Sequence, residues 1–414
     1  MSASSVRHTV STYRMQTVYR SIGMLVYTEQ IGMSFVDNMK QLVTSQLIPK
    51  KRDSSVLGID IGDSAIKLVQ LRNEQGVAVL ETYGEIALGP YGDAVVGQPV
   101  RLEPETLAKA LKELMQGAGV TSASAGVSVP YSASLVKLIE VPALDAKQLA
   151  TVIPIEARKY IPAPINEVQL DWFIVPETEQ RLFESLGDLD EAARSPLQKR
   201  LVLVVAMHNS MLEAHAQMLK LAGITPLFYE IEAFSVMRAA VDRSLTPVAI
   251  IDVGARTTKL YIIELGIILA SHVVQKGAGE ITKAIASNTH VSMQKAETLK
   301  RQYGVGNVTE GADSGVSHAG TLIVEQVFSE MRRVLAGFQR KYNKAISKVV
   351  LTGGGASLVG MKAFAQEQLE VEVELACPFA RTQSPAFLET TLQQSGIDFT
   401  VAVGLALRAL HENK

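Results

Sequence analysis

Ile59-Asp60-Ile61-Gly62 returns later in the chain as Ile251-Asp252-Val253-Gly254. Each copy is an apolar strand that ends in Asp-x-Gly, followed by a polar turn and a second apolar strand (66–71 and 259–263). A strand-turn-strand unit that recurs this far along a chain indicates a duplicated half-domain, whose two turns can face each other. Facing turns of this kind suit a phosphate chain, because glycine allows close approach and turn N–H groups bind anions.

A third glycine-rich stretch, Gly353-Gly354-Gly355, directly follows the short apolar strand 349–352. Three glycines after a strand are typical of a backbone that lies flat against a bulky group, such as an adenine ring or an α-phosphate. A flexible connection would need only one glycine. The aspartates that close the duplicated strands would repel phosphate, so the pattern predicts a hydrated magnesium ion held through water by Asp60 and Asp252.

Composition indicates a folded protein of several lobes. A chain of 414 residues with 47% hydrophobic and 20% charged residues is too long for one simple core and too apolar for general disorder. The net charge of −2 leaves no global electrostatic surface for nucleic acid, so we expect no nucleic-acid partner. The single cysteine, Cys377, fits a reducing cytoplasm, and no apolar run reaches the roughly 20 residues of a membrane span.

Strand and helix patterns alternate through both halves of the chain, which predicts α/β lobes with mixed sheets. Residues 134–199 interrupt the first half as an inserted unit, and 177–199 and 304–320 are polar or glycine-rich enough to predict loops. Residues 1–52 match neither half and predict a loosely structured extension; a basic juxtamembrane tail is the alternative.

The order Asp-x-Gly, Asp-x-Gly, Gly-Gly-Gly resembles the actin-like ATPase superfamily of sugar kinases, chaperone ATPases and FtsA. Within it, the chain is most similar to the PilM family of type IV pilus assembly. The discriminating segments are Glu156-Ala157-Arg158-Lys159-Tyr160-Ile161-Pro162-Ala163-Pro164 and Gly404-Leu405-Ala406-Leu407-Arg408, with Ala296-Glu297-Thr298-Leu299-Lys300 between them. The resemblance implies an α/β, actin-like (ribonuclease H-like) two-lobed fold with an inserted 1C-type subdomain. It divides the chain into 53–133 and 200–247 (1A), 134–199 (1C), 248–285 and 346–414 (2A), and 286–345 (2B).

The resemblance implies that ATP and Mg²⁺ bind between the lobes. The turn glycines Gly62 and Gly254 would cradle the β- and γ-phosphates. Side chains that could add donors or compensate phosphate charge are Ser64, Lys67, Arg256, Thr257, Thr258 and Lys259. The two lysines fit equally well as surface charges at strand edges. Asp63 departs from the family pattern, which usually has Ser, Thr or Gly at this position of the turn. Its carboxylate either points to solvent or weakens nucleotide binding by repelling phosphate.

Further positions match the family's nucleoside contacts and its water-orienting acid. Gly277, Gly279 and Glu280 resemble the segment that passes beneath the ribose. Glu297 and Lys300 match positions that contact adenosine, although by spacing alone they read as a surface ion pair. Gly353, Gly354, Gly355 and Ser357 complete the predicted site. Glu232 matches the acid near the γ-phosphate, and an acid in a helix's first turn is equally explained by the helix dipole.

The resemblance implies a cytoplasmic ATP-binding adapter, with at most weak ATPase activity, recruited to the cytoplasmic face of the inner membrane. Its partner would be the N-terminal peptide of PilN, and through PilN also PilO and other pilus proteins of that membrane; self-association stays open. The peptide would lie between the first-lobe sheet and the inserted subdomain, with 135–141 and 158–164 as walls. The alternatives are an FtsA-like polymerising division protein and a small-molecule kinase, for which we find no catalytic aspartate.

Overall fold

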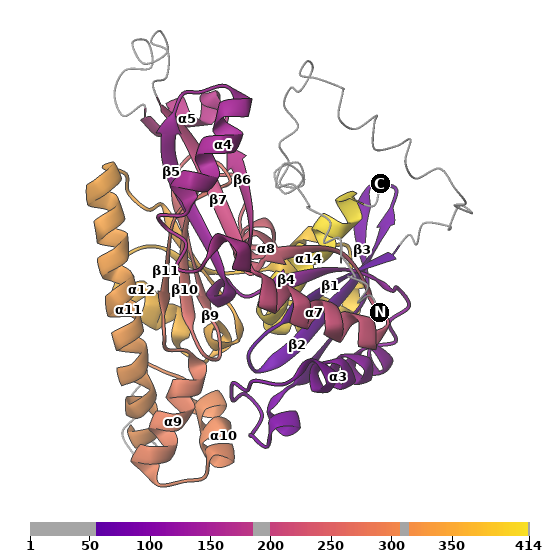
Figure 1. Cartoon of the computed structure of the whole chain (residues 1–414). Coiled ribbons are helices and arrows are strands. Elements are labelled where there is room, and N and C mark those ends of the chain that lie inside the picture. Colours follow the sequence, from indigo (N-terminus) through magenta and orange to yellow (C-terminus); the bar gives the residue numbers. More distant parts are fainter. Residues whose placement is uncertain (1–54, 185–198, 307–313, 413–414) are drawn as a thin grey trace, which may run out of the picture.

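The computed structural model describes residues 55–184, 199–306 and 314–412, so the predicted extension at 1–52 lies outside the described residues. Two five-stranded sheets form the body of the molecule, and a three-stranded sheet forms a smaller layer beside them (Figure 1). The described helices pack on these sheets, as the alternating pattern predicted.

The first sheet has the order β3-β2-β1-β4-β8. Its strands are β1 (Ser55–Ile61), β2 (Ala65–Glu74), β3 (Val77–Ala87), β4 (Ser124–Val129) and β8 (Thr225–Ile231). Helices α3 (Pro104–Gly117) and α7 (Asn209–Ala222) share a core with one face of β1 through Leu57 and Ile59. Val56 on the other face joins the core that contains α8 (Glu232–Ala240) and α14 (Thr400–Glu412). Side chains that alternate between two cores explain why β1 is apolar from Val56 to Ile59.

The second sheet repeats this arrangement with the order β11-β10-β9-β12-β13. Its strands are β9 (Val248–Val253), β10 (Thr258–Glu264), β11 (Ile267–Val274), β12 (Lys348–Thr352) and β13 (Val373–Leu375). Its helices are α9 (Ala278–Thr289), α10 (Met293–Tyr303), α11 (Ser314–Tyr342) and α12 (Met361–Leu369). In both sheets the aspartate of the first strand pairs with a lysine of the second, Asp60 with Lys67 and Asp252 with Lys259. The duplication predicted from two short motifs therefore extends to whole sheets.

The third sheet has the antiparallel order β5-β7-β6. It consists of β5 (Ser134–Pro142), β6 (Val168–Ile174) and β7 (Lys199–His208), with α4 (Ala146–Ala157) and α5 (Glu177–Glu184). The predicted boundary after residue 199 is wrong, because β7 pairs with β5 along its whole length and is the central strand of this sheet. Its uninterrupted apolar sequence reads like a first-lobe strand because a central strand is covered on both sides.

Three further predictions differ from the structure. Residues 177–184 form α5 instead of a loop, because the buried Gln180 attaches them to β7, donating to Lys199 O and accepting from Leu201 N. Residues 314–320 belong to α11, where the buried Val316 and Ala319 give the helix an apolar face despite two glycines. The C-terminal α14, assigned to the second lobe, also packs against β1; a Cβ on Gly58 would lie 2.0 Å from Ala402 O.

Candidate functional site

The two Asp-x-Gly turns have matching hydrogen bonds and lie against each other. Gly62 N donates to Ala65 O and Gly254 N donates to Thr257 O, both at 3.0 Å. An ion pair joins the turns, because Arg256 Nε donates to Asp63 Oδ1 at 2.9 Å. Segments far apart in the sequence thus form one site between the two five-stranded sheets.

The sequence left open whether the Asp63 carboxylate points to solvent or towards the predicted phosphate site. Its carboxylate is 43% exposed, yet it faces the guanidinium of Arg256, which was predicted to compensate phosphate charge. Its carbonyl also accepts from Val100 N at 2.9 Å, which holds the turn in place. In this arrangement the charge of Arg256 is already paired with Asp63.

Asp60 is held at the end of β1 by a serine that the sequence analysis missed. Ser128 Oγ donates to Asp60 Oδ1 at 2.9 Å and accepts from Ile61 N at 2.9 Å. Burial raises the pKa of the Asp60 carboxyl, and the opposing effects of Lys67 and Ser128 do not cancel the rise. One sequence signal could have identified Ser128: it is a polar residue within the apolar stretch 125–129 of β4.

Lys259 lies in a buried cluster with two carboxylates, so it is not a surface charge. Its Nζ donates to Glu232 Oε2 at 2.8 Å and to Asp252 Oδ2 at 3.1 Å, and its side chain is 12% exposed. Burial lowers the pKa of Lys259, but the two carboxylates outweigh this effect and raise it. The ammonium group therefore stays charged and holds Asp252 beside Glu232.

Glu232 has both oxygens engaged, since Oε1 accepts from Tyr131 N at 2.6 Å and Oε2 accepts from Lys259. Burial raises the pKa of Glu232, against the lowering effect of Lys259. Tyr131 was not predicted. Its hydroxyl hydrogen-bonds Ser271 Oγ of β11, and its ring packs on Tyr261 at a centroid distance of 5.4 Å. Glu232 is thus a junction between the first sheet, the second sheet and the start of β5.

Lys67 lies opposite Asp60 in the β1–β2 register and is half-buried. Burial lowers the pKa of Lys67, but Asp398, Glu85 and Asp60 outweigh this and raise it. The hydroxyl side chains predicted to bind phosphate differ in their environment. Thr258 Oγ1 donates to Lys276 O at 2.8 Å, which satisfies it within the fold. Thr257 is buried, whereas Ser64 is half-buried at the turn surface.

Gly277 and Gly279 pack against the back of the second turn. Ala278 N donates to Gly254 O at 2.9 Å, and Gly279 N donates to Ala255 O at 2.8 Å. A Cβ on Gly277 would lie 2.4 Å from Gly254 O, so only glycine fits there. Glu280, predicted with this pair, forms a solvent-facing pair with Lys283 at 2.6 Å. The glycines attach the start of α9 directly to the second turn.

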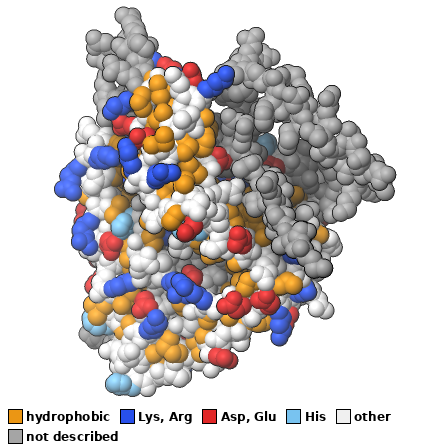
Figure 2. All heavy atoms as spheres, in the orientation of Figure 1, with side chains coloured by type: hydrophobic (Ala, Val, Ile, Leu, Met, Phe, Trp, Pro, Cys, Tyr) orange, Lys and Arg blue, Asp and Glu red, His pale blue; other side chains and the backbone are white. Residues whose placement is uncertain are grey.

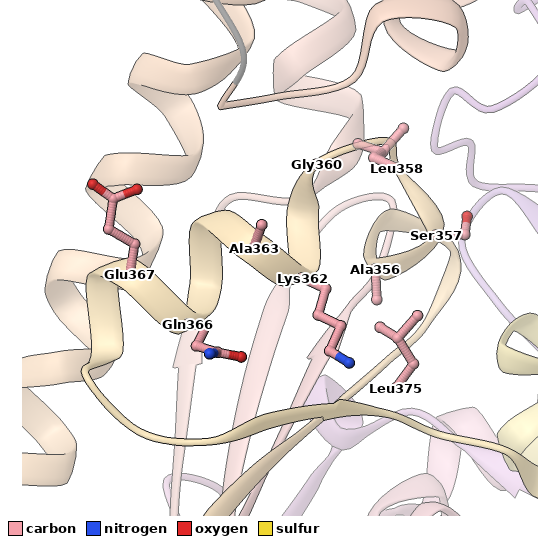
Figure 3. A pocket seen from close by; sticks show the side chains of 9 residues that line it. All are labelled: Ala356, Ser357, Leu358, Gly360, Lys362, Ala363, Gln366, Glu367 and Leu375. Atoms are coloured by element: carbon pink, nitrogen blue, oxygen red, sulfur yellow. The ribbon is translucent and has the colours of Figure 1, made fainter.

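The triple glycine wraps the end of β9 beside Asp252. Gly353 has φ +82°, and a Cβ there would lie 2.3 Å from Asp252 Oδ1; a Cβ on Gly355 would lie 2.4 Å from Val253 Cγ1. The close approach of the backbone to the Asp252 carboxylate therefore requires glycine at position 353, and the packing on Val253 requires glycine at position 355. Ser357 instead lines a separate cavity of about 740 Å³ within the second lobe (Figure 3). Its walls come from α12, Leu375 of β13 and the short 3-10 turn η4 (Gly354–Ser357).

Glu297 and Lys300 are buried, 6% and 4% exposed, so they do not form a surface ion pair. Lys300 Nζ contacts Glu297 Oε2 at 2.7 Å, Thr282 Oγ1 donates to the same oxygen at 2.7 Å, and Arg301 Nε donates to Oε1 at 2.8 Å. Burial raises the pKa of Glu297, but Lys300 and these donors outweigh it and lower the pKa. A carboxylate held ionised by three donors is a fixed acceptor beside the site.

A groove of about 610 Å³ runs between β5 and the second lobe, and we call it the β5–β11 groove. It is lined by Val136, Lys137, Leu138, Ile139, Glu140, Tyr160, Ile268, Leu269, Ala270, Ser271, Val334, Gly337, Phe338, Lys341 and Tyr342. The predicted walls 135–141 and 158–164 both contribute to it. The opposite wall comes from β11 and α11. The first-lobe sheet contributes no described residue to this groove, so the wall that was expected there stays a prediction. β5 and β11 are both edge strands of their sheets.

The sequence profile of the family described as type IV pilus assembly protein PilM matches residues 58–410. The chain belongs to the PilM family. A solved PilM–PilN type IV pilus biogenesis complex is similar to it, with a TM-score of 0.72 and 26% identity over 87% of this chain and 99% of that chain. The actin-like fold with an inserted subdomain, expected from the sequence, is thereby confirmed.

Two further relatives are more distant. The cell division protein FtsA of Bacillus subtilis (strain 168) is 25% identical over 148 residues, which cover 32% of this chain. The match spans only 34% of that relative's length. The ethanolamine utilization protein EutJ of Carboxydothermus hydrogenoformans has a TM-score of 0.49 and 14% identity, covering 95% of this chain and 99% of that one. Within residues 55–184, 199–306 and 314–412, no helix combines the length and apolarity that crossing a lipid bilayer requires.

Proposed function

We propose that this PilM-family chain is a nucleotide-gated adapter. It binds ATP with Mg²⁺ between its two five-stranded sheets, and it binds the N-terminal peptide of a PilN-type membrane partner in the β5–β11 groove. The observation that carries the nucleotide proposal is the direct contact between the two acidic turns, through Asp63 and Arg256. Two equivalent glycine turns that meet provide N–H groups and a cation for one polyphosphate.

The residues fit a hydrated magnesium ion. Asp60 and Asp252 end equivalent strands; burial is the main cause of the raised pKa of Asp60, and the charge of Asp252 adds a smaller rise. A dication between them would relieve that repulsion. Within the described ranges no three His, Cys, Asp or Glu residues form a direct metal site, so two carboxylates acting through water suit the chain better.

The chain's own residues would then divide the work. Mg²⁺ would supply positive charge that offsets the phosphates. Gly62, Gly254 and the amides after them would bind phosphate oxygens, and Arg256 would exchange Asp63 for phosphate. Glu232, with both oxygens already bonded, holds Lys259 and Tyr131 in position. An acid tied up in this way supports binding with slow turnover at most.

The partner proposal rests on the groove and on the family. Two sheet edges, β5 and β11, flank the groove, and an extended peptide can pair with such an edge while its side chains enter pockets. Figure 2 shows hydrophobic side chains gathered on the upper part of the molecule, where the three-stranded sheet and α4 lie. Tyr160, 45% exposed, lines the β5–β11 groove. Binding to a membrane protein would bring the chain to the cytoplasmic face of the inner membrane.

We propose that Glu232 couples the nucleotide cleft to the β5–β11 groove. Lys259 and Asp252 at the nucleotide cleft connect through Glu232 to Tyr131, whose hydroxyl bonds Ser271 in the groove wall. A nucleotide that repositions Asp252 would therefore act on the groove through this chain of hydrogen bonds. Coupling of this kind changes both ligand affinities by the same factor.

Isothermal titration tests the proposal with ATP·Mg and with the partner's N-terminal peptide, separately and together. Asp60→Ala and Asp252→Ala should abolish nucleotide binding and remove the effect of nucleotide on peptide affinity. Asp242→Ala, an aspartate with a 92% exposed side chain, is the matched control. Peptide affinity that is the same with and without nucleotide in the wild type would exclude gating.

The groove itself is tested by Tyr160→Ala, which should weaken peptide binding and leave nucleotide binding unchanged. Phe387→Ala is its control, because Phe387 is 82% exposed and lies outside the groove lining. If both variants lose peptide affinity equally, or if neither loses any, the assignment of the peptide to this groove is contradicted.

A further inference from the structure

One segment crosses from the first lobe to the second at the edge of the nucleotide cleft. We call residues 95–100 the strap; they precede α3. A Cβ on Gly97, which has φ +87°, would lie 2.6 Å from Glu297 Oε1. Pro99 Cδ lies 3.1 Å from the Cβ position of Gly279, and Val100 N donates to Asp63 O. The strap therefore touches α10, α9 and the first turn within a few residues.

Gln98, in the middle of the strap, has an unusual environment. It is 8% exposed, and its Nε2 is buried without a hydrogen-bond partner among the described residues. Burying an amide N–H without an acceptor is unfavourable, and folded proteins avoid it. An acceptor supplied by a ligand would remove that cost.

The same fold satisfies another buried glutamine completely. Gln70 is 2% exposed, and its Nε2 donates to Glu81 Oε2 at 2.7 Å and Thr121 Oγ1 at 2.8 Å. Its Oε1 accepts from Thr121 N and Ser122 N at 2.9 and 3.1 Å. The two buried glutamines therefore differ: the amide of Gln70 has a partner for each group named here, whereas Nε2 of Gln98 has none among the described residues.

We propose that Gln98 is a specificity-determining residue that donates from Nε2 to a sugar hydroxyl of the bound nucleotide. The inference rests on the proposed function, and it names the group that recognises the sugar. A sugar hydroxyl both donates and accepts a hydrogen bond. Glu297, beside Gly97, is a fixed acceptor, and Gln98 is a free donor. The pair complements one hydroxyl and leaves an amide unsatisfied when that hydroxyl is missing.

Two substitutions separate this role from a structural one. Gln98→Met keeps the chain length of the residue and removes the amide. It should weaken ATP·Mg binding roughly five- to twentyfold, the range expected for one lost hydrogen bond in a desolvated site. The loss should shrink when 2′-deoxy-ATP or 3′-deoxy-ATP replaces ATP, according to which hydroxyl is bound. Gln98→Met should also leave the ligand-free Tm unchanged or raise it, because an unpaired buried N–H is gone.

Gln70→Met is the matched control and should behave in the opposite way. It should lower the ligand-free Tm, because it leaves the partners of Gln70 unpaired, and it should leave nucleotide affinity unchanged. Wild-type affinity in Gln98→Met overturns the proposal while the proposed function stands; tighter binding does the same and would identify the strap as a competitor of the nucleotide. A fall in ligand-free Tm like that of Gln70→Met also overturns it. Failure of the wild-type chain to bind any nucleotide overturns both proposals.

Discussion

Replacing Asp63 by serine should strengthen nucleotide binding. The carboxylate occupies Arg256 at 2.9 Å, and it sits in a turn that we propose to hold phosphate. Serine removes the negative charge and keeps a small polar side chain in the turn. Arg256 would then face the phosphates without first leaving an ion pair.

The structure sets the size of this effect. The Asp63 and Arg256 side chains are 43% and 39% exposed, so breaking their pair costs only about 0–1 kcal/mol. Repulsion between a carboxylate and a phosphate charge about 5 Å away, at an effective dielectric constant of about 40–80, is about 1–2 kcal/mol. We therefore expect Asp63→Ser to lower the Kd of ATP·Mg about five- to thirtyfold.

Isothermal titration at constant Mg²⁺ and low salt measures this change. Arg256→Ala should weaken binding, and the double variant should show that Asp63→Ser gains less when Arg256 is absent. The gain should also decrease as salt is added, because both groups are partly exposed. A wild-type chain that binds ATP, with an Asp63→Ser variant that binds it equally or more weakly and folds normally, would refute the reasoning.

Three other outcomes follow from buried contacts. Glu230 is buried between Arg238 (2.7 Å) and Arg408 (2.6 Å), so Glu230→Gln should lower the free energy of unfolding by about 3–5 kcal/mol, measured by urea denaturation. Burial would raise the pKa of Glu230, but the two guanidinium groups lower it to about 2, below its ordinary value of 4.5. Its contribution to stability should therefore be complete above pH 4.5 and disappear as pH falls towards 2, a dependence that Glu230→Gln should lack. Gly277→Ala should cost at least about 1–3 kcal/mol in thermal unfolding and weaken ATP binding, because its Cβ would meet Gly254 O at 2.4 Å; a fully stable variant with normal ATP affinity would contradict the packing of α9 on the turn.

Much of the fold could be predicted because its signals are local. An apolar strand, an Asp-x-Gly turn and a second apolar strand can be recognised within about a dozen residues, and their recurrence predicted two equivalent sheets. The same holds for α3, which begins at Pro104, and for α4, which Asp145 caps through Lys147 N and Gln148 N. Local signals failed for α5, because its many charged residues are typical of a loop. They also failed for β7, because its apolar sequence does not show to which sheet it belongs.

The sequence by itself determined which residues would end the duplicated strands, and hence that Asp60 and Asp252 occupy equivalent places. Only the tertiary structure decided what surrounds them. Ser128 supports Asp60 and Lys259 joins Asp252 to Glu232, while Asp63 meets Arg256 across the two lobes. Such contacts join residues from separate strands and lobes. Strand period and turn chemistry act over a few neighbouring residues. These pairs depend instead on how whole sheets pack, so sequence spacing does not predict which side chains come into contact.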